Sequence, residues 1–175
     1  MKEQILDEND IESMVSRISS EILQRNFSPS SLMIIGLKKR GDILAHKIAT
    51  KIESTSGSSI SISAIDITFY RDDVNLKAYK CINKDERPLD VTDKNIILVD
   101  DVIFTGRSIR AAMAVLMDTG RPKSIQLAVL IDRGSREIPI QPDYVGKRIM
   151  VDPGSDVSVH LKETDGENAA FVSNL

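Results

Sequence analysis

The chain has 175 residues, with 23 Lys and Arg against 26 Asp and Glu and a formal net charge of −3. This length predicts a single domain that needs no disulfide or metal for stability. The mildly acidic balance disfavours a non-specific nucleic-acid binder, although it allows a local basic patch. Cys81 is the only cysteine and there are two histidines, which excludes an internal disulfide, disfavours structural zinc and predicts a cytoplasmic protein. We expect no association with a membrane, because no apolar run could cross a bilayer and the first residues do not resemble a signal peptide.

The first part of the chain alternates between helical and strand patterns. Residues 10–26 have the one-face apolar spacing of an amphipathic helix, with Asn9 and Glu12 as the expected capping box. Residues 31–37 are a short, continuous apolar run, typical of a strand covered on both faces. A second amphipathic helix is expected from Gly41, so a strand, a basic turn and a helix follow in order.

The middle of the chain contains a linker, a strand and a long charged segment. Residues 54–59 are only Ser, Thr and Gly, which predicts a surface loop. The strand expected over 60–70 changes the parity of its apolar residues, and a β-bulge near Ala64 would reconcile the two halves. Residues 71–90 are charged and contain few large aliphatic side chains, which indicates a mobile, functional loop.

The most hydrophobic strand is expected over 95–99 and is predicted to end at Asp100-Asp101. A helix is expected over 106–119, with Gly120 as its left-handed stop. Another buried strand is expected over 125–131. These elements repeat the order of strand, polar turn and helix.

The C-terminal segment is predicted to form two short strands within 143–162, around a turn at 152–154, and the polar tail from Glu163 is expected to fray. Strands that alternate with helices predict an α/β fold with a mostly parallel central sheet flanked by helices. In such sheets the ligand lies beyond the carboxyl ends of the strands. Polar or basic clusters follow three of the predicted strands, over 38–41, 100–108 and 132–134.

Residues 96–108 carry the strongest chemical signal. A buried strand brings Asp100 and Asp101 to the sheet edge, and a loop with Thr105 and Gly106 follows where a helix begins. The start of a helix offers unpaired N–H groups to a phosphate, and paired carboxylates suit sugar hydroxyls and a nearby Mg²⁺. The combination predicts a pocket for a ribose that carries a 5′-phosphate. Taken singly, the same residues have a plain structural explanation: two Asp that end a strand and a Thr that caps a helix.

The combined order resembles the phosphoribosyl pyrophosphate (PRPP) signature of the type I phosphoribosyltransferases. Residues 65–73 resemble the segment before the catalytic loop of the PyrR family, and residues 132–140 with 143–147 resemble the hood of that family. The resemblance covers about residues 5–147. It implies the type I phosphoribosyltransferase fold and a uracil phosphoribosyltransferase that makes UMP and pyrophosphate from uracil and PRPP with Mg²⁺. It also implies a bacterial regulator of pyrimidine operons that binds RNA.

The resemblance assigns roles to the matching residues. The pyrophosphate-binding turn would be Lys38, Lys39, Arg40 and Gly41. The catalytic residues would be Asp100, Asp101 and Arg71, the two Asp also facing Mg²⁺ through bound PRPP. The 5′-phosphate loop would be Val102, Ile103, Phe104, Thr105, Gly106, Arg107 and Ser108. The base and hood residues would be Asp132, Arg133, Gly134, Arg136 and Lys147, within a hood over about 132–162. The family also implies homodimers or higher oligomers. On sequence alone, Arg71 is equally compatible with an exposed ion pair to its acidic neighbours.

Three positions depart from the family pattern. Ser135 stands where the hood usually has His, Gln141-Pro142 replaces Arg-Ala, and residues 148–152 replace Asn-x-Pro-Thr-Ser. The changes leave the residues expected to bind PRPP intact. They weaken the prediction that uracil is the base, and they weaken the prediction of RNA binding more. We therefore predict weak or absent sequence-specific RNA binding. Three hypotheses stay open: a uracil phosphoribosyltransferase, an RNA-binding regulator that uses the pocket as a nucleotide sensor, and a transferase for another base.

Overall fold

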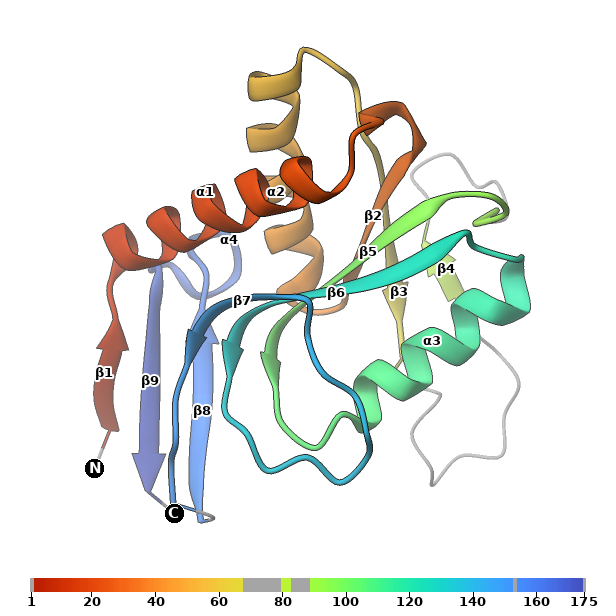
Figure 1. Cartoon of the computed structure of the whole chain (residues 1–175). Coiled ribbons are helices and arrows are strands. Elements are labelled where there is room, and N and C mark those ends of the chain that lie inside the picture. Colours follow the sequence, from red (N-terminus) through yellow and green to blue (C-terminus); the bar gives the residue numbers. More distant parts are fainter. Residues whose placement is uncertain (1, 68–79, 83–88, 153, 175) are drawn as a thin grey trace.

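The computed structural model describes residues 2–67, 80–82, 89–152 and 154–174, which form two sheets and four α-helices (Figure 1). The large sheet has the order β4-β3-β2-β5-β6-β7 and the small sheet the order β1-β9-β8. The strands of the large sheet are β2 (Leu32–Leu37), β3 (Ser61–Asp66), β4 (Lys80–Ile82), β5 (Asn95–Ile103), β6 (Ser124–Asp132) and β7 (Tyr144–Arg148). The strands of the small sheet are β1 (Lys2–Leu6), β8 (Ser155–His160) and β9 (Ala169–Asn174). The helices are α1 (Glu8–Arg25), α2 (Gly41–Ser56), α3 (Arg107–Thr119) and α4 (Lys162–Asp165), and a 3₁₀ turn spans Pro29–Ser31.

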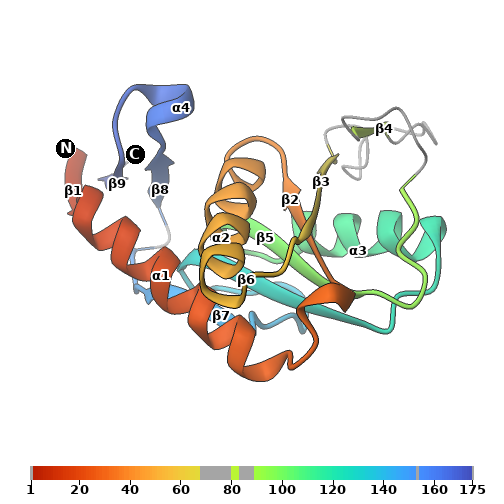
Figure 2. The same ribbon diagram turned by 90° about the horizontal axis from the view of Figure 1, so that it is seen from above.

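Five strands of the large sheet are parallel, and only β4 runs antiparallel to its neighbour β3. Helices α1 and α2 cover one face and α3 covers the other (Figures 1 and 2). Ile34 and Ile97 point toward α1 and α2, whereas Ile35 and Leu98 point toward α3, and all four are fully buried. This two-sided burial explains the continuous apolar runs of β2 and β5. The α/β fold with a mostly parallel sheet is confirmed.

The helices differ from the expectation at their ends. Helix α1 is capped by Asp7 with a capping box to Asp10, so the box expected from Asn9 and Glu12 is wrong. The same spacing occurs two residues earlier, and Asp is as good an N-cap as Asn. Helix α2 continues through most of the expected linker to Ser56 before a left-handed Gly57. The hydroxyls in its last turn are accommodated because they donate to the carbonyl of Lys51.

Strand β3 pairs with β2 in unbroken register from Ser61 to Ile65, so the expected bulge near Ala64 is wrong. The parity change arises because β3 is covered on both faces: Ile62 packs against the core under α1 and α2, and Ile65 lies in the core on the α3 side. Strand β4 falls inside the segment expected to be a loop. Most of that segment, 71–79 and 83–88 with Arg71, lies outside the described residues.

Strand β5 is longer than expected. Its pairing with β6 continues to Ile103, so Asp100 and Asp101 lie within the strand rather than at its end. Gly120 follows α3 as expected but has extended backbone (φ 161°) instead of the left-handed conformation. Glycine is needed there for space, because a Cβ would lie 2.6 Å from Oγ1 of Thr92.

The C-terminal tail is ordered, contrary to the expectation that it frays. Residues 169–174 form β9, the middle strand of the small sheet, between β1 and β8. The two strands expected within 143–162 are present as β7 and β8, but they belong to different sheets. The hood predicted over 132–162 therefore includes strands of both sheets, and its role stays a prediction. Within the part of the chain that the structure describes, no helix has the length and apolarity to cross a bilayer.

Candidate functional site

Three polar turns lie at one edge of the large sheet. They follow the carboxyl ends of β2, β5 and β6, which are parallel neighbours. Residues 38–40 form the first turn, 104–106 the second and 133–140 the third. The structure therefore brings together the clusters that the sequence analysis singled out, at the place where α/β sheets bind ligands.

The first turn packs directly against the strand that carries the carboxylates. A Cβ at Gly41 would lie 2.5 Å from the carbonyl oxygen of Val99 and 3.1 Å from Cα of Asp100. Only glycine allows α2 to begin this close to β5. Arg40 precedes the helix with a left-handed backbone (φ 71°), and its carbonyl accepts the N–H of Leu44 at 3.0 Å. The basic turn and the Asp pair are thus parts of one site.

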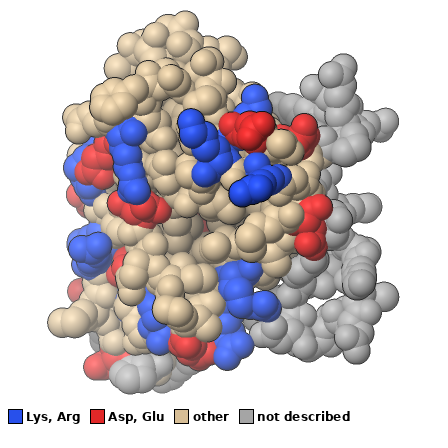
Figure 3. Space-filling model, turned by 45° about the vertical axis from the view of Figure 1, so that its right-hand side comes forward, with Lys and Arg blue, Asp and Glu red and all other residues tan. Residues whose placement is uncertain are grey.

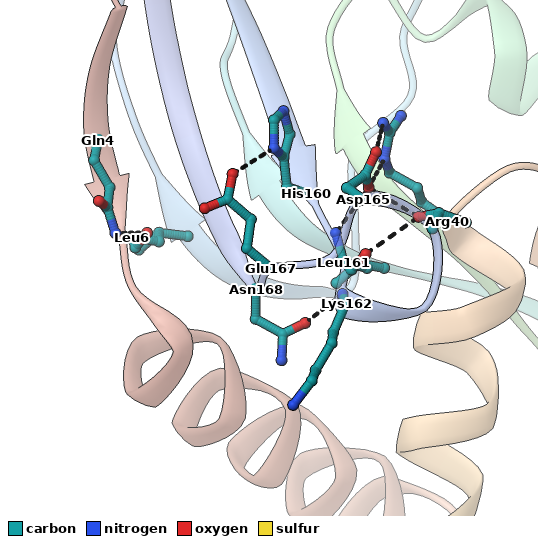
Figure 4. A network of polar contacts seen from close by, with 10 residues as sticks. Gln4, Leu6, Arg40, His160, Leu161, Lys162, Asp165, Glu167 and Asn168 are labelled. Carbon is teal, nitrogen blue, oxygen red and sulfur yellow. Dashed lines mark hydrogen bonds and ion pairs between the residues drawn. The ribbon is translucent and has the colours of Figure 1, made fainter.

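Arg40 is fixed from the other side by the C-terminal segment. Its Nε donates to Oδ2 of Asp165 at 3.1 Å and its Nη2 donates to Oδ1 at 2.9 Å, as seen in Figure 4. The bidentate pair holds the pKa of Asp165 well below its usual range, helped by the N–H of Leu161. Asp165 was not predicted as a site residue, because the polar tail from Glu163 was expected to fray. The signals that could have predicted it are Gly166 after a short polar run and the strand-like segment 169–173.

The two carboxylates of β5 differ in charge environment. The pKa of Asp100 is raised well above its ordinary value, chiefly by burial and then by the negative charge of Asp101. The pKa of Asp101 is raised as well by burial, but the N–H of Val102 and the charge of Arg40 oppose this. Two coupled acids with separated pKa values suit a site in which one carboxylate stays ionised. Arg40 therefore favours ionisation of Asp101.

The phosphate loop has the backbone expected of an anion site. Gly106 takes a left-handed conformation (φ 90°) as the N-cap of α3, and a Cβ there would lie 3.0 Å from Cγ1 of Ile138. Oγ1 of Thr105 accepts the N–H of Arg107 at 3.3 Å. Arg107 and Ser108 are exposed in the first turn of α3, where N–H groups point away from the helix.

Other residues assigned to the loop serve the fold. The side chain of Ile103 is buried in the core on the α3 side of the sheet, and that of Val102 is partly buried against the core under α1 and α2. Phe104 is 38% exposed, and the guanidinium of Arg133 lies 4.0 Å from its ring centroid. Only the backbone of Val102 and Ile103 is left to contact a phosphate.

Among the residues predicted to contact the base, Asp132 and Arg136 make protein contacts that hold the second turn. Oδ1 of Asp132 accepts the N–H of Gly134 at 3.0 Å and Nη2 of Arg136 at 2.7 Å. Nη1 of Arg136 donates to the carbonyl of Phe104 at 2.9 Å. Lys147 points elsewhere, its Nζ donating to the carbonyl of Ile5 in β1. Asp132 and Arg136 therefore clamp the third turn onto the phosphate loop, and contact of these residues with a base stays a prediction.

The donor set fits Mg²⁺ carried in by a phosphate ligand. Asp100 and Asp101 are adjacent carboxylates, and among the described residues no cluster of three or more His, Cys, Asp or Glu could hold a metal by itself. Mg²⁺ is commonly bound by one or two carboxylates together with substrate phosphates. The site therefore suits a metal that arrives with its substrate.

The chain is similar to known proteins over nearly its whole length. The model of the phosphoribosyl transferase domain matches residues 1–164. The bifunctional protein PyrR of Acetivibrio thermocellus is 47% identical over 175 residues, covering 99% of this chain and 95% of the relative. The protein of the same name from Bacillus subtilis is 45% identical over 171 residues, covering 96% and 94%.

Solved structures show the same fold at low identity. The hypoxanthine phosphoribosyltransferase of Trypanosoma cruzi has a TM-score of 0.75 at 16% identity and covers 98% of this chain and 96% of its own. A hypoxanthine-guanine phosphoribosyltransferase of Bacillus anthracis has a TM-score of 0.74 at 18% identity, covering 98% and 97%. The chain belongs to the PyrR family of phosphoribosyltransferase-domain proteins.

Proposed function

We propose that the chain is a uracil phosphoribosyltransferase that makes UMP and pyrophosphate from uracil and PRPP. The observation that carries the proposal is the packing of a basic turn onto an Asp-Asp strand that leads into a glycine-capped helix. A Cβ at Gly41 would lie 2.5 Å from the carbonyl of Val99, so the cationic turn and the carboxylates occupy one site. Such a site matches the three parts of PRPP: an anionic pyrophosphate, a neutral ribose with hydroxyl groups and an anionic 5′-phosphate.

The reaction breaks the bond between C1′ of the ribose and the pyrophosphate oxygen and forms a bond from C1′ to N1 of uracil, whose proton leaves. Positive charge develops at C1′ and negative charge on the leaving pyrophosphate. Mg²⁺, when bound with PRPP, would neutralise part of the pyrophosphate charge. Asp101 orients the ribose hydroxyls, and Arg40 with Lys38 and Lys39 binds the departing group.

The start of α3 fixes the other end of the substrate. The N–H groups of Gly106, Arg107 and Ser108 and the hydroxyl of Thr105 are placed to bind the 5′-phosphate. The clamp between Arg136 and the carbonyl of Phe104 keeps this loop in place before substrate arrives. Preorganised donors raise the rate because they need not reorient during the reaction.

The test is a panel of uracil, cytosine, hypoxanthine and guanine, each supplied with PRPP and Mg²⁺, with nucleotide and pyrophosphate measured. We expect UMP from uracil and at least a tenfold lower rate with the other bases. Asp101→Asn should lose activity, whereas Asp93→Asn, at an exposed carboxylate before β5, should keep it. Product from purines alone would replace uracil with another base, and no product with any base would contradict the transferase.

An RNA-binding regulator is the second candidate, favoured by 45% identity over nearly the whole chain to relatives named bifunctional. Against it, Ser135, Gln141 and Asp152 stand where the family has groups suited to RNA. On the face drawn in Figure 3, Lys and Arg side chains alternate with Asp and Glu and form no continuous basic stripe. We therefore expect weak binding to pyrimidine-operon leader RNA at physiological salt with UMP present. Sub-micromolar, sequence-selective binding in a gel-shift assay would make regulation a main role.

A further inference from the structure

We propose that Asp165 is a positioning residue for the pyrophosphate turn: its carboxylate holds the guanidinium of Arg40 where the pyrophosphate of PRPP is received. This inference rests on the proposed function. The contact joins α4, close to the C-terminus, to the turn between β2 and α2, 125 residues earlier in the chain. Figure 4 shows the carboxylate of Asp165 facing Arg40 at the start of α2.

The pair is geometrically specific. Two parallel hydrogen bonds, Nε to Oδ2 at 3.1 Å and Nη2 to Oδ1 at 2.9 Å, fix both the position and the plane of the guanidinium. The side chains are 33% and 20% exposed, so the pair is partly shielded from solvent and salt. A single-point contact from Lys would fix only the position of a charge.

Asp165 is itself held in place. Oδ2 also accepts the N–H of Leu161 at 2.9 Å and the hydroxyl of Thr164 at 2.8 Å. Helix α4 is tied to α2 by an ion pair between Glu163 and Lys47, with Oε1 2.6 Å from Nζ. The carboxylate therefore acts from a fixed support and not from a free tail.

Arg40 needs this support and keeps the capacity to bind an anion. Its left-handed backbone (φ 71°) is unfavourable for a residue with a Cβ and must be stabilised by its surroundings. Asp165 uses Nε and Nη2, so the two N–H groups of Nη1 are not engaged by this pair. The pKa of Arg40 is raised chiefly by its hydrogen bonds to Asp165 and also by the charge of Asp101, so both carboxylates stabilise the charged guanidinium.

A purely structural role for Asp165, as an anchor of the small sheet, predicts a different result. An anchor would affect all ligands equally through loss of stability. A positioning residue affects the ligand that contacts Arg40 and spares the ligand that contacts the start of α3. Inorganic pyrophosphate and ribose 5-phosphate separate the two roles, because each occupies one half of the PRPP site.

The experiment measures the dissociation constants of pyrophosphate, ribose 5-phosphate and PRPP, with Mg²⁺, by calorimetry on the full chain. We expect Asp165→Asn to weaken pyrophosphate and PRPP binding about fivefold, as for loss of one partly exposed ion pair, with ribose 5-phosphate unchanged. Asp165→Glu should restore part of the loss. Glu167→Gln removes a contact to His160, at 2.9 Å, that lies just after α4 and does not touch Arg40, and should leave all three constants unchanged. In an Arg40→Gln background, Asp165→Asn should have no further effect.

Unchanged or tighter pyrophosphate binding in a folded Asp165→Asn protein would overturn the inference. Tighter binding would show that the carboxylate of Asp165 competes with pyrophosphate for Arg40. Equal weakening of ribose 5-phosphate would also overturn it and assign Asp165 to stability. If the wild-type chain binds PRPP but makes no UMP, uracil transfer is refuted, and the dissociation constants still decide the role of Asp165. Wild-type chain that binds neither PRPP nor pyrophosphate refutes both.

Discussion

Gly41 allows the pyrophosphate turn to pack closely against the strand that carries the two carboxylates, so Gly41→Ala tests whether this close packing is needed for activity. The new Cβ would lie 2.5 Å from the carbonyl of Val99, about 0.9 Å short of an ordinary contact of 3.4 Å. The atoms in contact are backbone, so the start of α2 must move away from β5. Overpacking of this kind costs about 1–3 kcal/mol of stability. A displacement near 1 Å in a catalytic site lowers turnover about a hundredfold.

The assay compares thermal unfolding, PRPP affinity and UMP formation in Gly41→Ala and in Gly57→Ala. Gly57 ends α2 with φ 67° and has no atom within 4 Å of an added Cβ, so alanine there costs about 1–2 kcal/mol in backbone conformation alone. We expect both variants to lose stability and only Gly41→Ala to lose activity. Wild-type PRPP affinity and turnover in Gly41→Ala would refute the reasoning, and so would an equal loss of activity in Gly57→Ala.

The remaining predictions concern the phosphate loop and the Asp pair. Gly106→Val should abolish ribose 5-phosphate binding in a folded protein, and Thr105→Val should weaken it about fivefold. Pyrophosphate binding should stay unchanged in both variants. An unchanged affinity for ribose 5-phosphate would show that the 5′-phosphate binds elsewhere. Asp101→Asn should lower turnover about a hundredfold with the melting temperature nearly constant, and full activity would exclude its role at the ribose. Asp100→Asn should lower turnover but raise the free energy of unfolding at pH 7 by about 1 kcal/mol. Stability rises because the pKa of Asp100 is higher in the folded than in the unfolded chain, so its ionised carboxylate destabilises the fold at pH values above the folded pKa. This destabilisation disappears as the pH falls below the unfolded pKa near 3.8. A melting temperature that does not rise at pH 7 would contradict this.

Local patterns predicted the centre of the fold well. The strands β2, β5 and β6 and the helix α3 were predictable because continuous apolar runs and helical spacing reflect burial on both faces of the sheet. The ends of elements were harder. At the start of α1 two capping boxes compete, and Asp7 with Asp10 forms the one observed. The extension of β5 to Ile103 depends on pairing with β6, which lies beyond the reach of a local pattern.

The small sheet was the part that sequence predicted least, because only its strand β8 was expected. Its strand β9 pairs with β1 from the opposite end of the chain, with Lys2 opposite Ser173. Strand β1 carries apolar residues only at its end, and no local pattern indicates that it pairs with a strand at the other end of the chain. The ion pair between Asp165 and Arg40 is also non-local, because 125 residues separate the two side chains in sequence. The position of the turn after β5 and of the Asp pair was predictable because a strand, two carboxylates and a helix start occur consecutively in sequence, and their roles in binding stay predictions.

We propose that three turns at one sheet edge form a single PRPP site with separate places for pyrophosphate and 5′-phosphate. The backbone amide NMR spectrum of the ¹⁵N-labelled chain tests this arrangement when the chain is titrated with pyrophosphate and Mg²⁺ or with ribose 5-phosphate. We expect pyrophosphate to move the signals of residues 38–41 and ribose 5-phosphate to move those of 105–108, with PRPP moving both sets. Shifts confined to other parts of the sheet, or both ligands acting on one turn alone, would contradict it.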